Sequence, residues 1–474
     1  MPNKMLNTQQ STGSNHHPFT DGMRALTVKI SGGSSVLVPR DYSLLTPYIL
    51  IEQEDWFEDE IRFLRSVLKP GQSVLDIGAN YGCYTMSMAQ VVGSSGVVTA
   101  VEPGNQASSY LEQSACLNNS SSIDVLRGAL GAEDGTALLA QSPNPELNHL
   151  TDNDSDLTAQ KVRLHKLDTL AKDKPALGNL DFVKLDAEGS EISILNGGQV
   201  VFESQSPMVM FERMHGSTAN KKLIDAFESI GYRIFSLAPG LGILTPYEPN
   251  RADVFNLNLF ALKPDRIAEA SKEGWLTATV PAAQTPTDLA SPFFADGDAI
   301  NRYAQMRAIE SMKFKSTNVP GLFLLARTAL AIGRRGAAVN LLLRALKTAQ
   351  SSKLKHDDII VPPDPLLDAD VPKDAGTEWG LVAAISSYER ARAFSSYFTQ
   401  PDTLPLLQWV GTTPYHTPEM ERRLQLIQLR TGQREHLAEH PIFINAGTRH
   451  LNRQVWLGDC TTTASPALKK MIHV

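Results

Sequence analysis

A glycine-rich turn is the part of the sequence best suited to chemistry. One carboxylate directly precedes it, and another follows about 20 residues later. Residues 73–85 read SVLDIGANYGCYT, in which a carboxylate, a glycine, an asparagine and a second glycine occupy every second position: Asp76, Gly78, Asn80 and Gly82. Glycine allows close approach of the backbone and positive φ angles, and asparagine tolerates the left-handed region. Such a turn is typical of a site for a nucleotide-like ligand, although tight packing against a neighbouring element would require the same glycines.

The residue types favour one kind of ligand. An NAD or FAD site is expected to carry G-x-G-x-x-G, whereas this turn carries D-x-G-x-N-x-G. Asp76 would repel a pyrophosphate but would attract the ammonium and sulfonium of S-adenosylmethionine. Glu102 closes the next apolar run, VVTAVEP, about 20 residues further on, where a ribose-binding carboxylate is expected. An NAD-dependent oxidoreductase is therefore the weaker alternative.

Alternating strands and helices are needed to hold this turn. Between residues 24 and 265, apolar runs such as SVLDIG, GVVTAVEP, LDFVKLDAEG and SPMVMFE alternate with amphipathic helical stretches. Runs that are apolar throughout are typical of strands covered on both faces of a parallel sheet. We expect a doubly wound, mostly parallel α/β sheet, with GYRIFSLA and DVFNLNLFALKP paired antiparallel at one edge. Ligands of such sheets bind beyond the carboxyl ends of the strands, where this turn lies.

The rest of the chain differs in composition. Residues 1–23 are polar and predict a disordered tail, and residues 266–298 are rich in Pro, Ala, Thr and Ser and predict a linker. Residues 299–474 predict a mainly helical accessory domain. Within it, residues 319–350 resemble one tetratricopeptide-type helix pair, although such repeats usually need about three units to be stable.

Composition excludes several classes of function. The 474 residues are 42% hydrophobic and 20% charged, with a net charge of −7, which gives no general attraction for nucleic acid. Three scattered cysteines suit neither a disulfide framework nor a zinc site. No signal peptide and no membrane span are apparent. We expect a cytoplasmic protein.

Several motifs in order resemble one family. LKPGQSVLDIGANYGCYTMSMAQVVGSSGVVTAVEPGN is similar to the core of FkbM-type S-adenosylmethionine-dependent methyltransferases. GALG at 128–131, LHKLDTL at 164–170, FVKLDAEGSEISILNGG at 182–198 and PMVMFE ending at 212 extend the similarity. The resemblance covers about half of the chain, roughly residues 48–263.

The resemblance implies a class I methyltransferase fold, which is Rossmann-like with seven strands, and methyl transfer usually to a hydroxyl oxygen. It assigns the turn, Asp76, Gly78, Asn80 and Gly82, to S-adenosylmethionine, and Glu102 to its ribose. Ala129 would border the adenine ring. Asp186 and Glu188 would face the methyl group and the acceptor.

A hydroxyl acceptor must lose its proton, so the site needs a positioned base. Asp186 or Glu188 is the expected base, with His165 and His215 as runners-up. Asp186 could instead orient the amine of the cofactor. Carboxylates at strand ends could also hold Mg²⁺, with Asp186 and Glu212 converging, but no Asp-Asp-Asn constellation is visible and we expect no metal.

Simple structural roles compete with the catalytic ones. Glu188 and Glu191 could cap the helix that begins near residue 191, and Asp168 is most simply the N-cap of its own helix. The leading function is O-methylation of a sugar, glycan precursor or natural product. The alternative is a cofactor-binding scaffold whose C-terminal helices bind a protein partner or a second copy. Residues 141–156 are expected to line the acceptor.

Overall fold

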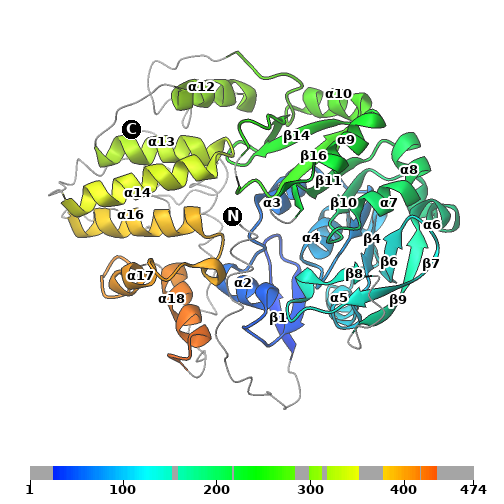
Figure 1. Ribbon diagram of the computed structural model, residues 1–474, viewed down its shortest axis with the longest axis horizontal. Coiled ribbons are helices and arrows are strands. Elements are labelled where there is room, and N and C mark those ends of the chain that lie inside the picture. Colours follow the sequence, from blue (N-terminus) through cyan, green and yellow to red (C-terminus); the bar gives the residue numbers. More distant parts are fainter. Residues whose placement is uncertain are drawn as a thin grey trace. The chain divides into compact units, whose positions relative to one another are not determined.

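The chain forms two compact units in the computed structural model (Figure 1). The first contains residues up to Ser236 together with Leu257–Glu273, and the second contains Leu237–Asn256 together with the chain from Gly274. The structure describes residues 25–151, 159–215, 218–252, 254–282, 298–311, 318–351, 377–416 and 418–434. The predicted tail at 1–23 and part of the predicted acceptor loop, 152–156, lie outside these ranges.

An eight-stranded sheet has the order β15-β14-β16-β11-β10-β3-β4-β5, and its strands other than β15 and the end of β14 belong to the first unit. The strands from β5 to β11 in this order are parallel, whereas β16 runs antiparallel to both β11 and β14, as predicted. The expected number of seven strands is wrong by one, because β15 adds an edge strand beyond β14. The strands are β3 (Ser73–Ile77), β4 (Val97–Glu102), β5 (Ile123–Arg127), β10 (Phe182–Leu185), β11 (Met208–Glu212), β14 (Arg233–Ala238), β15 (Ile243–Pro246) and β16 (Asn258–Leu262).

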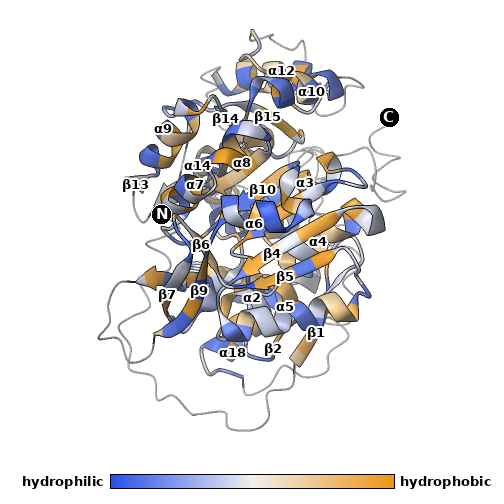
Figure 2. Cartoon of the chain, turned by 90° about the vertical axis from the view of Figure 1, so that its right-hand side faces the viewer, coloured by the Kyte–Doolittle hydropathy of each residue, from blue (hydrophilic) through white to orange (hydrophobic). Residues whose placement is uncertain are grey.

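Helices cover both faces of this sheet. On one face, Phe63 of α3 packs edge-on against Phe260 of β16, and α4 and α5 lie beside it. On the other face, Phe211 of β11 packs against Phe227 of α9. Figure 2 shows hydrophobic colours along β4 and α4, as expected for a strand and a helix buried in this core. The helices are α3 (Asp59–Val67), α4 (Cys83–Val92), α5 (Asn105–Leu117), α6 (Leu167–Asp173), α7 (Glu191–Gly197), α8 (Gln199–Ser204) and α9 (Lys221–Ser229).

Two details of the helices differ from expectation. The helical stretch at 191–205 is split into α7 and α8 at Gly198, where a β-carbon would lie 2.7 Å from Leu167 Cδ2. Asp168 does not cap its own helix. Its carboxylate accepts hydrogen bonds from the amides of Val200 (3.2 Å) and Val201 (3.1 Å), so it caps α8 from a neighbouring helix.

Smaller elements surround the main sheet. A second sheet has the order β6-β9-β7-β8, and Gly128, at φ +155°, separates β6 from β5. The remaining elements of this region are β1 (Ala25–Lys29), β2 (Ser35–Pro39), α2 (Leu45–Gln53), η1 (Gly93–Ser95), β6 (Ala129–Gly131), β7 (Gly135–Ala140), η2 (Pro145–Leu147), β8 (His149–Thr151), β9 (Gln160–Lys166), η3 (Pro175–Gly178), β12 (Met214–His215) and β13 (Thr218–Ala219).

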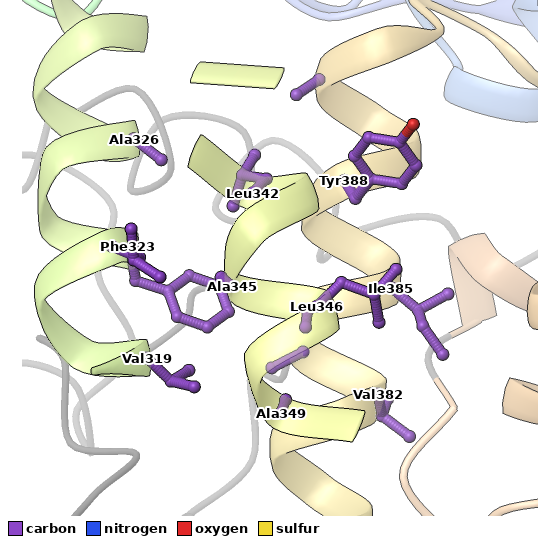
Figure 3. Close-up of a cluster of buried hydrophobic side chains, with 14 of the residues drawn as sticks. Val319, Phe323, Ala326, Leu342, Ala345, Leu346, Ala349, Val382, Ile385 and Tyr388 are labelled. Carbon is purple, nitrogen blue, oxygen red and sulfur yellow. The ribbon is translucent and has the colours of Figure 1, made fainter. Parts of the chain in front are cut away.

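The second unit contains three long helices that share one apolar core. Phe323 of α13, Leu346 of α14 and Ile385 of α16 are buried in this core, together with several alanines that let the helices approach (Figure 3). The two helices α13 and α14 coincide with the pair expected at 319–350. The helices of this unit are α12 (Ala299–Ser311), α13 (Val319–Ala331), α14 (Arg335–Ser351), α16 (Thr377–Arg392), α17 (Leu404–Val410) and α18 (Pro418–Arg430), with η5 (Ser396–Phe398).

The boundary between the two units differs from a simple linker. Residues 266–273, expected to begin the linker, belong to α10 (Pro264–Glu273), where Ile267 and Ala270 are buried three positions apart. Leu241 and Ile243 precede this helix along the chain but belong to the second unit. They pack into its core with Tyr303 and Met306. Among the helices in the described ranges, none has the length and apolar character needed to cross a membrane.

Candidate functional site

The carboxyl ends of the parallel strands bring the predicted residues to one edge of the sheet. Ile77 of β3 is paired with Val101 of β4 on one side and with Leu185 of β10 on the other. Leu185 is in turn paired with Phe211 of β11. The residues that follow these positions are therefore neighbours at this edge: Gly78, Glu102, Asp186 and Glu212.

The conformation of the glycine turn is set by packing. Gly78 has φ +74°, and a β-carbon there would lie 1.8 Å from the carbonyl oxygen of Asp186. Gly82 has φ +93°, and a β-carbon there would lie 2.5 Å from Leu111 Cδ1. Neighbouring protein atoms thus account for both glycines, as the packing alternative expected. The consequence for a ligand is indirect: Gly78 lets the turn lie directly against the segment that carries Asp186.

Glu102 joins the turn to the end of β4. Its Oε2 accepts a hydrogen bond from the amide of Asn80 (2.8 Å), and its Oε1 accepts one from the amide of Gly104 (2.7 Å). Burial raises the pKa of Glu102 to about 7, although both amides favour the charged form. Each carboxylate oxygen can accept two hydrogen bonds, so both retain capacity for the two hydroxyls of a ribose.

Asn80 supports the same assignment of the turn. It adopts φ +49°, and its Oδ1 is buried without a hydrogen-bond partner among the described residues. A buried acceptor without a donor is costly, and a ligand donor would remove that cost. The turn and Glu102 therefore fit a ligand that has a ribose and nitrogen donors, as S-adenosylmethionine has.

The contact expected between Asp76 and the cofactor stays a prediction, and the structure shows the protein partners of this carboxyl group. Its side chain is fully buried, and its Oδ2 accepts a hydrogen bond from Thr85 Oγ1 (2.6 Å). Its Oδ1 lies 3.9 Å from Lys184 Nζ. Burial raises the pKa of Asp76, and Lys184 and Thr85 oppose that rise. The carboxyl group of Asp76 thus lies between the Thr85 hydroxyl and the Lys184 ammonium.

Lys184 is the important residue that sequence reasoning missed. Its ammonium is buried, lies 2.7 Å from Asp186 Oδ2, and is 5.3 Å from the centre of the Tyr84 ring. Burial alone would lower the pKa of Lys184, but Asp186 and Asp76 outweigh it and raise the pKa. A signal was present in the sequence, since a lysine in the otherwise apolar strand FVKL needs a buried partner.

Tyr84 extends this arrangement to a further carboxylate. Its hydroxyl donates a hydrogen bond to Glu58 Oε2 (2.5 Å), at the residue that precedes α3. Burial raises the pKa of Glu58, and the nearby carboxylate of Asp186 raises it further. Glu58 therefore belongs to the same edge of the sheet as Asp186.

The carboxylates near the expected acceptor position make few hydrogen bonds. The side chain of Asp186 is 42% exposed, and Glu188 is exposed at φ +46°. Protein atoms crowd Glu188 and, together with the charge of Asp186, raise its pKa to about 8. Partial burial and then Asp186 raise the pKa of Glu212 to about 9. Glu188 and Glu212 therefore hold a proton more readily than an ordinary carboxylate does, and pKa values shifted in this way are common in active sites.

The other predicted residues lie at different places. Ala129 opens β6 immediately after the edge, and His165 of the adjacent strand β9 is buried against Gly128 rather than near Asp186. Burial lowers the pKa of His165. Glu191 accepts hydrogen bonds from the amides of Ala187 and Gly189, which is the structural role considered for it. The side chain of His215 lies outside those the structure describes.

No metal centre is evident in the described parts of the chain, where no group of three or more His, Cys, Asp or Glu side chains could hold an ion. The absence of a metal therefore stays a prediction.

A family model provides an independent comparison. The model described as "Methyltransferase FkbM domain" matches residues 76–234, from the turn to β14. A search of curated proteins finds no match.

Solved structures that resemble the chain include several methyltransferases. The FkbM methyltransferase of Methylobacillus flagellatus is 19% identical over 45% of this chain and 50% of its own, with a TM-score of 0.31. This chain thus spans half of that protein. An S-adenosylmethionine-dependent methyltransferase of Aquifex aeolicus is 14% identical over 46% and 91%, with a TM-score of 0.26. Fibrillarin of Aeropyrum pernix, solved with bound S-adenosylmethionine, is 11% identical over 50% and 93%, with a TM-score of 0.27.

TM-scores this low carry no argument about function. The assignment of the family therefore rests on the family model and on the residues at the edge of the sheet. The match begins at Asp76, includes Glu102 and Asp186, and extends past Glu212. Residues 76–234 match the FkbM methyltransferase domain, and this match supports S-adenosylmethionine as the methyl donor.

Proposed function

We propose that this protein is an O-methyltransferase that acts on a hydroxyl of a sugar, a glycan precursor or a natural product. The observation that carries the proposal is the position of Asp186 and Glu188, which follow β10 and lie beside the turn that fits the cofactor. Transfer to a hydroxyl needs a base close to the methyl group, whereas transfer to a neutral amine has less need of one.

Bound S-adenosylmethionine supplies a methyl group on a positively charged sulfur atom. Transfer of this methyl group to a hydroxyl oxygen would require the hydroxyl proton to pass to a carboxylate of the protein. Glu102 and the turn hold the donor, so much of the rate enhancement comes from alignment of the reacting atoms. We assign Asp186 to hold the acceptor hydroxyl or to take its proton, with Glu188 as the alternative base.

Lys184 gives Asp186 the properties that this role needs. The 2.7 Å contact with Lys184 fixes one oxygen of the Asp186 carboxylate, which leaves the other oxygen for the acceptor. Lys184 itself is buried, so it acts through Asp186 and is a positioning residue.

Transfer of a labelled methyl group from S-adenosylmethionine into extracted hydroxyl compounds tests the proposal, with analysis for alkali-stable methyl ethers. We expect Asp186→Asn to lower the transfer rate about 100-fold or more and to change the Kd of S-adenosylhomocysteine less than about threefold. Asp225→Asn, at an exposed position on α9, is the matched control.

Three results would contradict parts of this proposal. Label found only on nitrogen or carbon would exclude O-methylation. A loss of S-adenosylhomocysteine affinity as large as the loss of rate would show that Asp186 orients the donor. An unchanged rate in Asp186→Asn, with a large loss in Glu188→Gln, would transfer the role of base to Glu188.

A further inference from the structure

Polar side chains continue along the edge of the sheet beyond Asp186, and they lie on one face. Lys184 is paired with Asp76 on one side and with Met210 on the other, and Met210 is paired with Phe260. Side chains two positions apart on a strand share a face. Glu212, two residues after Met210, therefore lies on the same face as Lys184, towards α3 and α4.

Asn258 is the next member of this row. It is the first residue of β16 and is directly paired with Glu212 in the antiparallel ladder. Directly opposed residues have β-carbons about 5 Å apart on the same face. The Asn258 and Glu212 side chains are therefore adjacent, at the position next to Asp186.

The hydrogen-bonding capacity of Asn258 is not used within the described part of the chain. The residue is only 9% exposed, and its Nδ2 is buried without a hydrogen-bond partner among the described residues. A buried amide without a hydrogen-bond partner destabilises the folded state, so a native chain seldom keeps one without a use. The side chain of Glu212 likewise makes no hydrogen bond to any described residue, although it is partly exposed.

An amide next to a carboxyl group suits a particular kind of ligand. The amide donates through nitrogen and accepts through oxygen, and the carboxyl group of Glu212, whose raised pKa favours the protonated form, can donate its proton and accept through its carbonyl oxygen. Two neighbouring hydroxyls, each both a donor and an acceptor, can satisfy such a pair. A single hydroxyl could accept from the amide and donate to the carboxyl group, but it would leave the second N–H of the amide and the second carboxyl oxygen unused. An apolar group would leave both side chains without a partner.

The charges around the pair limit the ligand further. Partial burial and then the carboxylates of Asp186, Glu188, Glu191 and Glu58 disfavour the ionised form of Glu212. A phosphate or carboxylate on the acceptor would meet the same repulsion, whereas a neutral polyol would not.

We propose that Glu212 and Asn258 form an acceptor subsite that binds two neighbouring hydroxyls of an uncharged sugar and rejects the phosphorylated form of the same sugar. The subsite holds the sugar so that a further hydroxyl lies at Asp186. This inference rests on the proposed function, because it places the sugar beside the methyl-transfer position.

Direct binding of sugars tests the subsite without knowledge of the natural acceptor. The full-length protein, saturated with S-adenosylhomocysteine, is titrated with methyl glycosides of glucose, galactose, mannose and rhamnose, and with glucose 6-phosphate, galactose 6-phosphate and mannose 6-phosphate. Saturation-transfer NMR measures each Kd. We expect at least one neutral glycoside to bind, and its phosphorylated counterpart, where the panel includes one, to bind at least tenfold more weakly.

Variants then locate the binding. Asn258→Ala and Glu212→Gln should each weaken the glycoside at least fivefold and leave the Kd of S-adenosylhomocysteine unchanged, which also shows that the variants fold. Asn258→Ser keeps a donor and should retain part of the affinity. Asn196→Ala on α7 and Glu228→Gln on α9, both exposed, are matched controls.

The outcomes separate this inference from the proposed function. Failure of every neutral glycoside to bind, or equal binding of the phosphates, overturns the substrate class. Glycoside binding that is unchanged in both variants overturns the subsite. Either result can occur while labelled methyl ethers still form, whereas label on nitrogen alone overturns the proposed function.

Discussion

The edge of the sheet at the carboxyl ends of its strands has two parts that are built in opposite ways. The donor half contains Asp76, the glycine turn and Glu102, and the acceptor half contains Asp186, Glu188 and Glu212. At the donor half, backbone amides satisfy both oxygens of Glu102, and Thr85 and Lys184 face Asp76. At the acceptor half, Glu188 and Glu212 are held by no hydrogen bond of their side chains to a described residue, and their pKa values are raised towards or above neutrality. The donor half, whose carboxylates are held by backbone amides, Thr85 and Lys184 while Asn80 Oδ1 has no donor among the described residues, suits a cofactor that never changes. The acceptor half, whose Glu188 and Glu212 carboxyl groups are held by no such bonds, suits a substrate and a proton.

The contact between the two halves is the place where a single change should have the largest effect. We expect Gly78→Ala to destabilise the first unit by about 3–5 kcal/mol, because the added carbon would meet the Asp186 carbonyl at 1.8 Å and φ is +74°. Urea unfolding followed by tryptophan fluorescence measures the change. Gly135→Ala is the control, since nothing lies within 4 Å of its β-carbon, and a loss in Gly78→Ala as small as in that control would show that the halves are not rigidly joined.

Removal of the Glu102 carboxylate should affect the donor half alone. Glu102→Ala takes away the charged acceptor of two amides and of the ribose, so we expect about 100-fold weaker binding of S-adenosylmethionine and S-adenosylhomocysteine by calorimetry. NAD should not bind either protein measurably. Glu112→Ala, which removes an exposed carboxylate on α5, should change the Kd less than twofold. Binding of NAD alone by the unaltered protein would refute the cofactor assignment.

The pH dependence of cofactor binding should be the smallest of these effects. Burial raises the pKa of Glu102 to about 7, and ribose hydroxyls donate to its ionised form, so the ligand favours the deprotonated state. The Kd of S-adenosylhomocysteine should therefore fall as the pH rises from 6 to 8, by about tenfold if only the ionised form binds.

Calorimetry in buffers with different ionisation enthalpies checks the direction of this proton exchange. Binding at pH 7 should release part of a proton, and Glu102→Gln should abolish both the release and the pH dependence. Dependence of the same size in Glu102→Gln would assign it to the acceptor half instead, where Glu188 and Glu212 also ionise above pH 7.

The donor half could be predicted from the sequence because its residues follow one another closely. The turn, Glu102 and the strands that carry them are local patterns, and the structure places them together at one edge. The roles within the turn were less predictable. Gly78 and Asp76 contact protein atoms that are far away in the sequence, so only the register of β3 with β10 shows what they contact.

Long-range pairing explains most of what the sequence did not reveal. Asn258 is distant from Asp186 along the chain and becomes its near neighbour only through the order of β10, β11 and β16. Asp168 caps α8 because α6 and α8 lie side by side, which no capping pattern within α6 could indicate. The linker expected at 266–298 began too early because α10 is short and rich in charges, with few buried residues.

The excursion of the chain at Leu237–Asn256 has a consequence for synthesis on the ribosome. β16 lies between β11 and β14 in the sheet, so the first unit cannot be completed before Leu262 has emerged. Leu241 and Ile243 emerge before that point. Their apolar partners extend to Ile332, which is synthesised about 90 residues after Ile243. At about 5–20 residues per second, these side chains wait for several seconds without their native cover. Binding by chaperones during translation should therefore concentrate on this interval. A stop codon after Pro264 would leave Leu241 and Ile243 permanently without their partners in the second unit.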